Sequence, residues 1–254
     1  MHRQLVLATV PMIAPDAVVS HLSAAVLHGL PVWTDALAHV QITRPGVGAG
    51  KRRGYLHLHI AALDPAEVTQ LGGIAVTSLA RTVADLGRTV PFEQAVTAGD
   101  AALRAGLAPA NLTAALNCAR GRRGVGAARR VAQFLDGRSE SPGESLSRVV
   151  LHRLGMPTPT LQYDVFDEAG FLVGRSDFCW EAARTLGEFD GKVKYGPLVK
   201  PGETAADVVY REKRREDALR DQGWQVVRWS WADLKHEQQL AERLHRAFRR
   251  GQRP

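Results

Sequence analysis

Apolar residues recur at strand or helix spacing along most of the chain, and the pattern changes near residue 92. Before it, short alternating runs separated by turns predict strands mixed with helices, whereas residues 92–136 show helical spacing throughout. The predicted strands span 40–43, 55–60 and 74–76, and the predicted helices span 21–29, 79–88, 92–105, 109–119 and 125–136. Residues 1–15 show no clear period and are expected to be poorly structured.

A domain boundary is expected at 137/138, because the composition changes there and a strong helix start follows. Ser141 can cap this helix, Pro142 suits its first position, and Glu144 can complete a capping box. The predicted elements are a helix from 142, strands over 161–166, 171–180 and 184–190, a helix over about 204–221, a strand over 224–229 and a helix over 232–249. This order predicts one mixed sheet flanked by helices. We therefore expect a mixed α/β region over 1–137 and an α/β/α domain over 138–254.

Three carboxylates are expected to meet on this second sheet. Glu188 and Asp190 occupy alternate positions of one strand, so they share a face, and an antiparallel neighbour would bring Asp177 beside them. Carboxylates that share a sheet face repel one another unless a divalent cation binds them. The pattern therefore predicts a site for Mg²⁺ or Mn²⁺ formed by these three residues.

Two lysines follow the carboxylates directly and suggest a reaction. A hard metal with a nearby ammonium group, from Lys192 or Lys194, suits hydrolysis of a phosphodiester. In this interpretation Lys194 stabilises the transition state and Glu144 orients a metal-bound water. Glu144 also has a structural interpretation, because a capping box alone would account for it. The sequence thus predicts a magnesium-dependent endodeoxyribonuclease.

The charge of the chain favours a polyanionic partner. The formal net charge is +7, and residues 1–140 carry 14 Lys and Arg against 9 Asp and Glu, while residues 141–254 carry 19 against 17. DNA is the expected partner, with Lys192, Lys213 and Arg228 as candidate DNA-binding residues. Two of them have alternatives, because Lys213 lies on a largely solvated helix face and Arg228 could pair with a structural carboxylate.

Other basic and metal-binding residue types give weaker signals. Lys51, Arg52 and Arg53 form a compact basic loop tip that is either a phosphate contact or simply solvated. His57 and His59 alternate on a strand, but no third zinc ligand lies close in sequence, so a structural role is favoured. Two cysteines exclude a disulfide framework, and no run is long enough for a membrane helix. We therefore expect a non-secreted, cytoplasmic protein.

Residues 139–250 resemble the PD-(D/E)xK nuclease superfamily, and more closely its very-short-patch-repair-like branch. The likeness rests on Glu144 in the opening helix, Asp177 at a strand end, Glu188-Phe-Asp190-Gly on the next strand, Lys194-Tyr195, and Gly223-Trp-Gln-Val-Val-Arg-Trp229. It implies a restriction-endonuclease-like core and metal-dependent attack of water on a phosphodiester. The superfamily usually has a lysine where this chain has Asp190. That departure supports an alternative, a non-catalytic regulator that uses the fold to bind DNA or protein.

The first half resembles the AbiEi antitoxin family of type IV toxin–antitoxin systems of actinobacteria. The likeness rests on SHLSAAVLHGLP from Ser20 and on Thr77-Ser-Leu-Ala-Arg-Thr-Val-Ala-Asp85. That family commonly begins with a winged-helix DNA-binding module, for which the residues before Ser20 are too few. The resemblance implies a role in toxin–antitoxin or defence systems, with a cognate toxin as a further partner.

Overall fold

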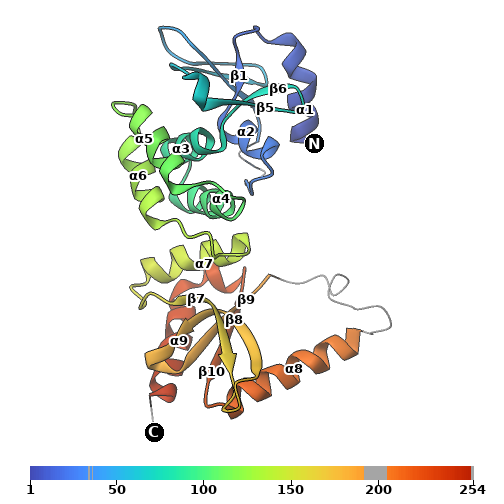
Figure 1. The fold of residues 1–254 in the computed structure, drawn as a ribbon, viewed down its shortest axis with the longest axis vertical. Helices are drawn as coiled ribbons and strands as arrows, with labels where there is room; N and C mark the ends of the chain where they lie inside the picture. Colours follow the sequence, from blue (N-terminus) through green and yellow to red (C-terminus); the bar gives the residue numbers. More distant parts are fainter. Residues whose placement is uncertain (34, 36, 192–204, 253–254) are drawn as a thin grey trace. The chain divides into compact units, whose positions relative to one another are not determined.

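The computed structural model describes residues 1–33, 35, 37–191 and 205–252, and the chain divides into two compact units (Figure 1). The N-terminal unit is Met1–Pro142 and the C-terminal unit is Gly143–Pro254. The sequence placed this boundary five residues earlier. Residues 136–139 stay with the N-terminal unit because the Asp136 amide donates a hydrogen bond of 2.7 Å to Asp100 on the preceding helical segment and Arg104 donates a hydrogen bond to the carbonyl of Ser139.

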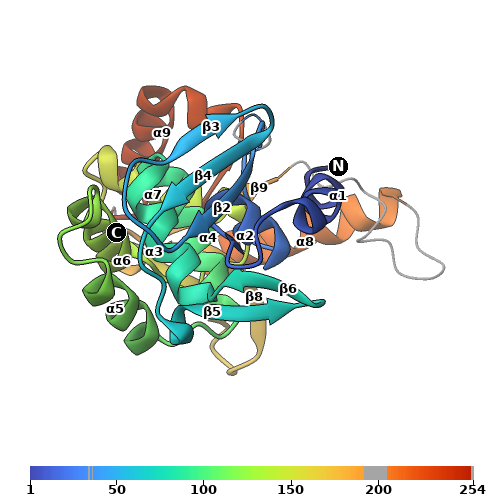
Figure 2. The ribbon, with the colours of Figure 1, turned by 90° about the horizontal axis from the view of Figure 1, so that it is seen from above.

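A six-stranded mixed sheet forms one layer of the N-terminal unit (Figure 2). Its strands are β1 (Val18–Val19), β2 (Val40–Arg44), β3 (Lys51–Arg53), β4 (Leu56–Ile60), β5 (Val68–Leu71) and β6 (Ile74–Thr77), in the order β3-β4-β2-β1-β6-β5. The pairs β1–β6 and β2–β4 are parallel and the others are antiparallel. The sequence predicted only β2, β4 and β6, because β1 is two residues long and the exposed residues of β3 are all basic.

Six helices accompany this sheet in the described part of the unit. They are α1 (His2–Thr9), α2 (His21–Leu27), α3 (Leu79–Thr89), α4 (Phe92–Arg104), α5 (Pro109–Cys118) and α6 (Val125–Phe134), with short 3₁₀ turns η1 (Val10–Met12) and η3 (Pro65–Glu67). The expectation that residues 1–15 lack structure was wrong. The side chain of Val6 on α1 is fully buried against the sheet core around Val19 and Val40, and this contact stabilises a helix with no strong periodic signal.

The C-terminal unit contains a four-stranded mixed sheet. Its strands are β7 (Thr160–Phe166), β8 (Leu172–Trp180), β9 (Thr185–Asp190) and β10 (Gln225–Ser230), in the order β10-β9-β8-β7. Strands β7, β8 and β9 pair antiparallel, and β10 runs parallel to β9. The helices are α7 (Pro142–Arg153), α8 (Ala205–Asp221) and α9 (Glu237–Gly251), with η4 (Glu181–Ala183) and η5 (Asp233–Lys235). The predicted mixed α/β class and the predicted order of elements are confirmed.

Helices cover both faces of this sheet (Figure 1). Residues of α7 and α9 share one core cluster with Phe178, Trp180 and Trp229. Leu219 of α8 shares a second cluster with Cys179. Because Phe178 and Cys179 are neighbours on β8, their side chains point to opposite faces. The C-terminal unit is therefore a three-layer structure, and none of the helices in the described part of the chain is long and apolar enough to cross a membrane.

Two glycines let α7 and the sheet approach closely. A Cβ on Gly143 would lie 1.8 Å from the Phe189 ring, and a Cβ on Gly187 would lie 2.5 Å from the Trp229 ring. The Trp229 indole also donates a hydrogen bond of 2.8 Å to Ser147 Oγ on α7. This packing fixes the first turn of α7 beside β9 and so places Glu144 near the sheet.

Candidate functional site

Asp177 binds the backbone at the point where β8 and β9 stop pairing. The paired residues run from Trp180–Thr185 to Phe178–Gly187, and one further step would place Asp177 opposite Glu188. Instead of another backbone bond, Asp177 Oδ2 accepts a hydrogen bond of 2.7 Å from the Phe189 amide. The strand register therefore places Asp177 next to Glu188, as the sequence predicted. One oxygen of Asp177, Oδ2, is bonded to the backbone of β9 and holds the two strands together.

Glu144 and Gln162 form a second contact in this region. Gln162 Nε2 donates a hydrogen bond of 2.8 Å to Glu144 Oε2, and Glu144 is 7% exposed. Gln162 lies on β7 between residues paired to Phe178 and Ser176, with a left-handed φ of 53°. Such a backbone conformation costs a non-glycine residue about 1–3 kcal/mol and is frequent at functional sites. Glu144 thus has a partner in the sheet, beyond the capping role that the sequence allowed.

Glu188 is held by two arginines. Its Oε1 lies 2.8 Å from Arg215 Nη2 on α8, and its Oε2 lies 2.9 Å from Arg228 Nε on β10. The side chain of Glu188 is only 12% exposed. Arg228 is the direct partner of Glu188 in the parallel β9–β10 register. The alternative that Arg228 pairs with a carboxylate is therefore the one the structure adopts.

Two further glutamates of α8 complete this group. Glu212 lies 3.0 Å from Arg215 and 3.7 Å from Arg228, and Glu216 lies 3.2 Å from Arg228. We call these five residues the glutamate–arginine cluster. The sequence did not single out Arg215, because the charges of α8 alternate in sign and resemble a solvated face. Arg215 differs from the other charged residues of α8 because the packing of α8 on the sheet brings it to Glu188.

The glutamate–arginine cluster is electrostatically tight. Burial opposes the charge of Arg215, but attraction to Glu188 and hydrogen bonds to Glu212 outweigh it, so the pKa of Arg215 lies above its ordinary value. Glu188 Oε1 and Arg228 Nε are buried at ion-pair distance without a well-aligned hydrogen bond. The contacts of Glu188 are therefore mainly attractions between opposite charges, and they depend on both arginines.

Glu188 does not fit the role of a metal ligand. Mg²⁺ requires oxygen ligands in near-ideal octahedral geometry at about 2.0–2.1 Å. Both oxygens of Glu188 already face guanidinium groups within 2.9 Å, and a cation there would lie against two positive charges. Among the described residues, no group of three or more His, Cys, Asp or Glu side chains is arranged to hold a metal ion. A site that includes Asp177 and Asp190 remains a prediction.

The other predicted site residues lie apart from this cluster or outside the described ranges. Asp190 ends β9 and is exposed. Lys213 is exposed on α8 and makes no ion pair with any described residue. Lys192 and Lys194, the predicted source of positive charge for catalysis, lie outside the described residues.

The N-terminal unit has its own buried charge cluster. Arg81 and Asp85 are both fully buried, and Arg81 Nε lies 2.8 Å from Asp85 Oδ2. Glu67 lies 2.9 Å from Arg81, and Arg88 lies 2.7 Å from the other Asp85 oxygen. Burial works against the charge of Arg81, but Asp85 and Glu67 outweigh it and hold the pKa of Arg81 above its ordinary value. This geometry gives Arg81 and Asp85 a structural role in the N-terminal unit.

Three histidines stack in the same unit. The ring centroids of His21 and His59 are 3.7 Å apart, and those of His57 and His59 are 4.0 Å apart. His21 is 3% exposed and has a φ of 52°. Burial lowers the pKa of His21 to about 4 and that of His59 to about 2, so the stack is neutral at pH 7. The sequence could not reveal it, because His21 lies far from the His57–His59 pair along the chain.

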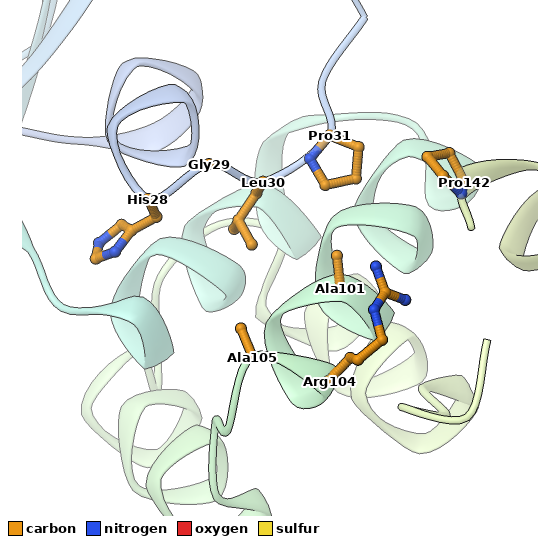
Figure 3. A pocket seen from close by; sticks show the side chains of 8 residues that line it. All are labelled: His28, Gly29, Leu30, Pro31, Ala101, Arg104, Ala105 and Pro142. Atoms are coloured by element: carbon orange, nitrogen blue, oxygen red, sulfur yellow. The ribbon is translucent and has the colours of Figure 1, made fainter. Parts of the chain in front are cut away.

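One pocket of about 430 Å³ opens in the N-terminal unit (Figure 3). Its lining residues are His28, Gly29, Leu30, Pro31, Ala101, Arg104, Ala105 and Pro142. In Figure 3 the Arg104 side chain rises beside Ala101 toward Pro142. That guanidinium already donates to the carbonyl of Ser139, and His28 Nε2 is bonded to the Thr77 carbonyl at 2.8 Å. None of the predicted site residues lines this pocket.

Comparison with known proteins finds two similar sequences from strains of Mycobacterium tuberculosis. They carry the names uncharacterized protein MT2308 and uncharacterized protein Rv2248, and each is 31% identical to this chain over 227 residues. That alignment covers 88% of this chain and 78% of each relative. No family model and no solved structure matches the chain. These names state no activity, so the chemistry of the site is argued from its geometry.

Proposed function

We propose that this chain, which belongs to the same family as the Mycobacterium tuberculosis proteins MT2308 and Rv2248, is a regulatory protein that binds nucleic acid without cutting it. In this proposal the C-terminal unit has a restriction-endonuclease-like core that serves as a binding platform. The order of its elements supports this, since a helix precedes three antiparallel strands and a second helix leads to a strand parallel to the third.

One observation carries the non-catalytic part of the proposal. The carboxylate at the position expected to bind the metal, Glu188, is held by Arg215 and Arg228 at 2.8 and 2.9 Å. Freeing it would leave two partly buried guanidinium groups short of their counter-charge, which is unfavourable. As the counter-charge of Arg215 and Arg228, Glu188 stabilises the packing of α8 on the sheet. In this role it is not an open ligand for a cation. We therefore derive no hydrolytic step through a metal.

The nucleic-acid part of the proposal rests on charge. The chain has a formal net charge of +7, and the excess is greater in residues 1–140 than in the rest. In the C-terminal unit, the positive charges of Arg215 and Arg228 are offset by the glutamates of the glutamate–arginine cluster. These two arginines therefore attract a polyanion only weakly. Affinity for nucleic acid should then be electrostatic and should fall steeply with salt. A regulatory protein of this kind, in a toxin–antitoxin setting, would have DNA and a cognate toxin as partners.

Metal-dependent hydrolysis is a second candidate function, and the conformation of Gln162 favours it. A strained, non-glycine residue that binds Glu144 lies next to Asp177 across the β7–β8 register. Backbone strain of this kind is more typical of a site with a chemical task than of a plain strand. In that case Asp177 and Asp190 would supply the ligands, because Glu188 does not fit.

The proposed function predicts salt-sensitive DNA binding that needs no metal. We expect a fluorescein-labelled DNA duplex to gain anisotropy on titration with the protein, with affinity falling by orders of magnitude between about 50 and 200 mM salt if six or more phosphates are contacted. Addition of EDTA should leave the affinity unchanged, because no cation takes part. Absence of binding at 50 mM salt would refute the proposal, and binding that requires Mg²⁺ would favour the second candidate.

A further inference from the structure

Strand β3 presents three consecutive cations at the border of the six-stranded sheet. Lys51, Arg52 and Arg53 are all exposed, and β3 pairs only with β4 (Figure 2). None of the three makes an ion pair or a side-chain hydrogen bond with any residue in the described part of the chain. We call these three residues the cationic edge.

Four acids of the N-terminal unit have other partners and do not compensate the cationic edge. Asp16 binds Arg44 at 2.8 Å, and Asp85 and Glu67 are used in the buried cluster around Arg81. Asp64 accepts a hydrogen bond from a backbone amide at the start of η3. The positive charge of the edge is therefore directed to solvent, where it attracts a polyanion.

The hairpin places these cations on both of its faces. Successive strand residues alternate, so Lys51 and Arg53 share one face and Arg52 lies on the other, opposite His57. Residues on one face are about 7 Å apart, at a rise of roughly 3.4 Å per residue. Strand β4 pairs with β2 on its other side, so β3 is the edge strand of the whole sheet and meets a ligand at the border of that sheet. The exposed cations of β3 can contact phosphates along the backbone of a duplex there.

The loop before β3 keeps the hairpin in a defined shape. A Cβ on Gly50 would lie 2.4 Å from the Leu58 carbonyl oxygen, so only glycine permits this close approach of the two strands. Residues 45–50 are all exposed, and three of them are glycines. The backbone of this loop between β2 and β3 is therefore accessible, and Val47 is its one large apolar side chain.

We propose that the cationic edge is a contact surface for the phosphate backbone of double-stranded DNA. The inference rests on the proposed function and assigns it to a site in the N-terminal unit. An acidic protein surface is the other polyanion to consider. DNA is favoured because residues 51–53 contain no apolar side chain, whereas protein interfaces are organised around buried aromatic or apolar anchors.

The test compares two variants that remove the same charge from the full-length protein. The first is Lys51→Gln with Arg52→Gln and Arg53→Gln. The control is Arg120→Gln with Arg129→Gln and Arg130→Gln, which removes three exposed cations from α6 and the turn before it. Affinity for a labelled DNA duplex is measured by anisotropy from 50 to 300 mM salt, and thermal unfolding of each variant is recorded to confirm folding.

We expect the edge variant to lose at least about 10-fold in affinity at 100 mM salt and to reduce the slope of log K against log salt by about 2–3, since each phosphate contact contributes about 0.9. The control should stay within about 3-fold of wild type, because net charge alone has a smaller effect than direct contacts. Equal losses in both variants, or wild-type affinity in the edge variant, would overturn the inference while leaving DNA binding itself intact. Absence of binding by the wild type would instead refute the proposed function.

A competition experiment separates the two kinds of polyanion. Polyglutamate is added to the wild-type complex at the same charge concentration as unlabelled DNA. We expect DNA to displace the labelled duplex at least about 10-fold more effectively, because the phosphates of a duplex are spaced along a rigid groove. Equal displacement by polyglutamate would contradict the DNA assignment and identify the edge as a surface for acidic proteins.

Discussion

Replacing Asp85 by asparagine is expected to destabilise the N-terminal unit by about 3–5 kcal/mol, because it removes the carboxylate that Arg81 and Arg88 share and leaves the fully buried Arg81 with Glu67 alone. Asp85 is fully buried and binds Arg81 with one oxygen and Arg88 with the other, at 2.8 and 2.7 Å. An amide can accept a hydrogen bond at one of these positions but cannot neutralise either arginine. Since single domains are stable by only about 5–15 kcal/mol, the change should shift unfolding strongly.

The control for Asp85→Asn is the exposed pair of Asp16 and Arg44. These side chains lie 2.8 Å apart but are 48% and 40% exposed, so water already solvates both charges. Urea unfolding should therefore give the same midpoint for Asp16→Asn as for wild type and a much lower midpoint for Asp85→Asn. Similar midpoints for the two variants would show that the buried cluster contributes nothing beyond an exposed ion pair.

Replacing Glu188 by glutamine is expected to cost the C-terminal unit roughly 2–3 kcal/mol, because charged partners that are partly buried lose their attraction. The loss stays below that of Asp85→Asn, since Glu188 and its two arginines are partly exposed whereas Arg81 and Asp85 are fully buried. Chemical unfolding followed by tryptophan fluorescence measures it, because Trp180, Trp224 and Trp229 all lie in this unit.

Asp164→Asn is the matched control in the same unit. Asp164 lies 3.9 Å from Arg175 and is 46% exposed, so its loss should stay within about 0.5 kcal/mol. A stability of Glu188→Gln equal to that of wild type would mean that the arginines do not depend on Glu188. The residue would then be available as a ligand, and the non-catalytic proposal would lose its main support.

The order of elements in the C-terminal unit could be predicted because local and tertiary preferences agree there. The start of α7 at Pro142 and the apolar alternation of β8 are both strong local signals. In the N-terminal unit β1, β3 and β5 were missed, because β1 has two residues, β3 is a run of cations, and β5 is a four-residue strand with no fully buried position. These strands exist because neighbouring strands pair with them.

The candidate site was predictable only in part, for a related reason. Alternation along β9 correctly places Glu188 in the strand, but its environment is set by Arg215 and Arg228, which come from elements far along the chain. A carboxylate that binds a metal and a carboxylate that pairs with two arginines have the same pattern of neighbouring residues in the sequence. Which of them occurs depends on how α8 packs against the sheet, and a single sequence does not encode that choice in any short motif.

Incubation of supercoiled plasmid with the protein and Mn²⁺ tests most directly the central claim that the protein binds nucleic acid without cutting it. Wild type, Asp177→Asn and Glu188→Gln are compared at equal concentrations, and nicked and linear products are quantified on a gel. The account predicts that the plasmid is retarded by wild type and stays supercoiled after the protein is removed. Manganese-dependent nicking by wild type that both variants abolish would contradict it.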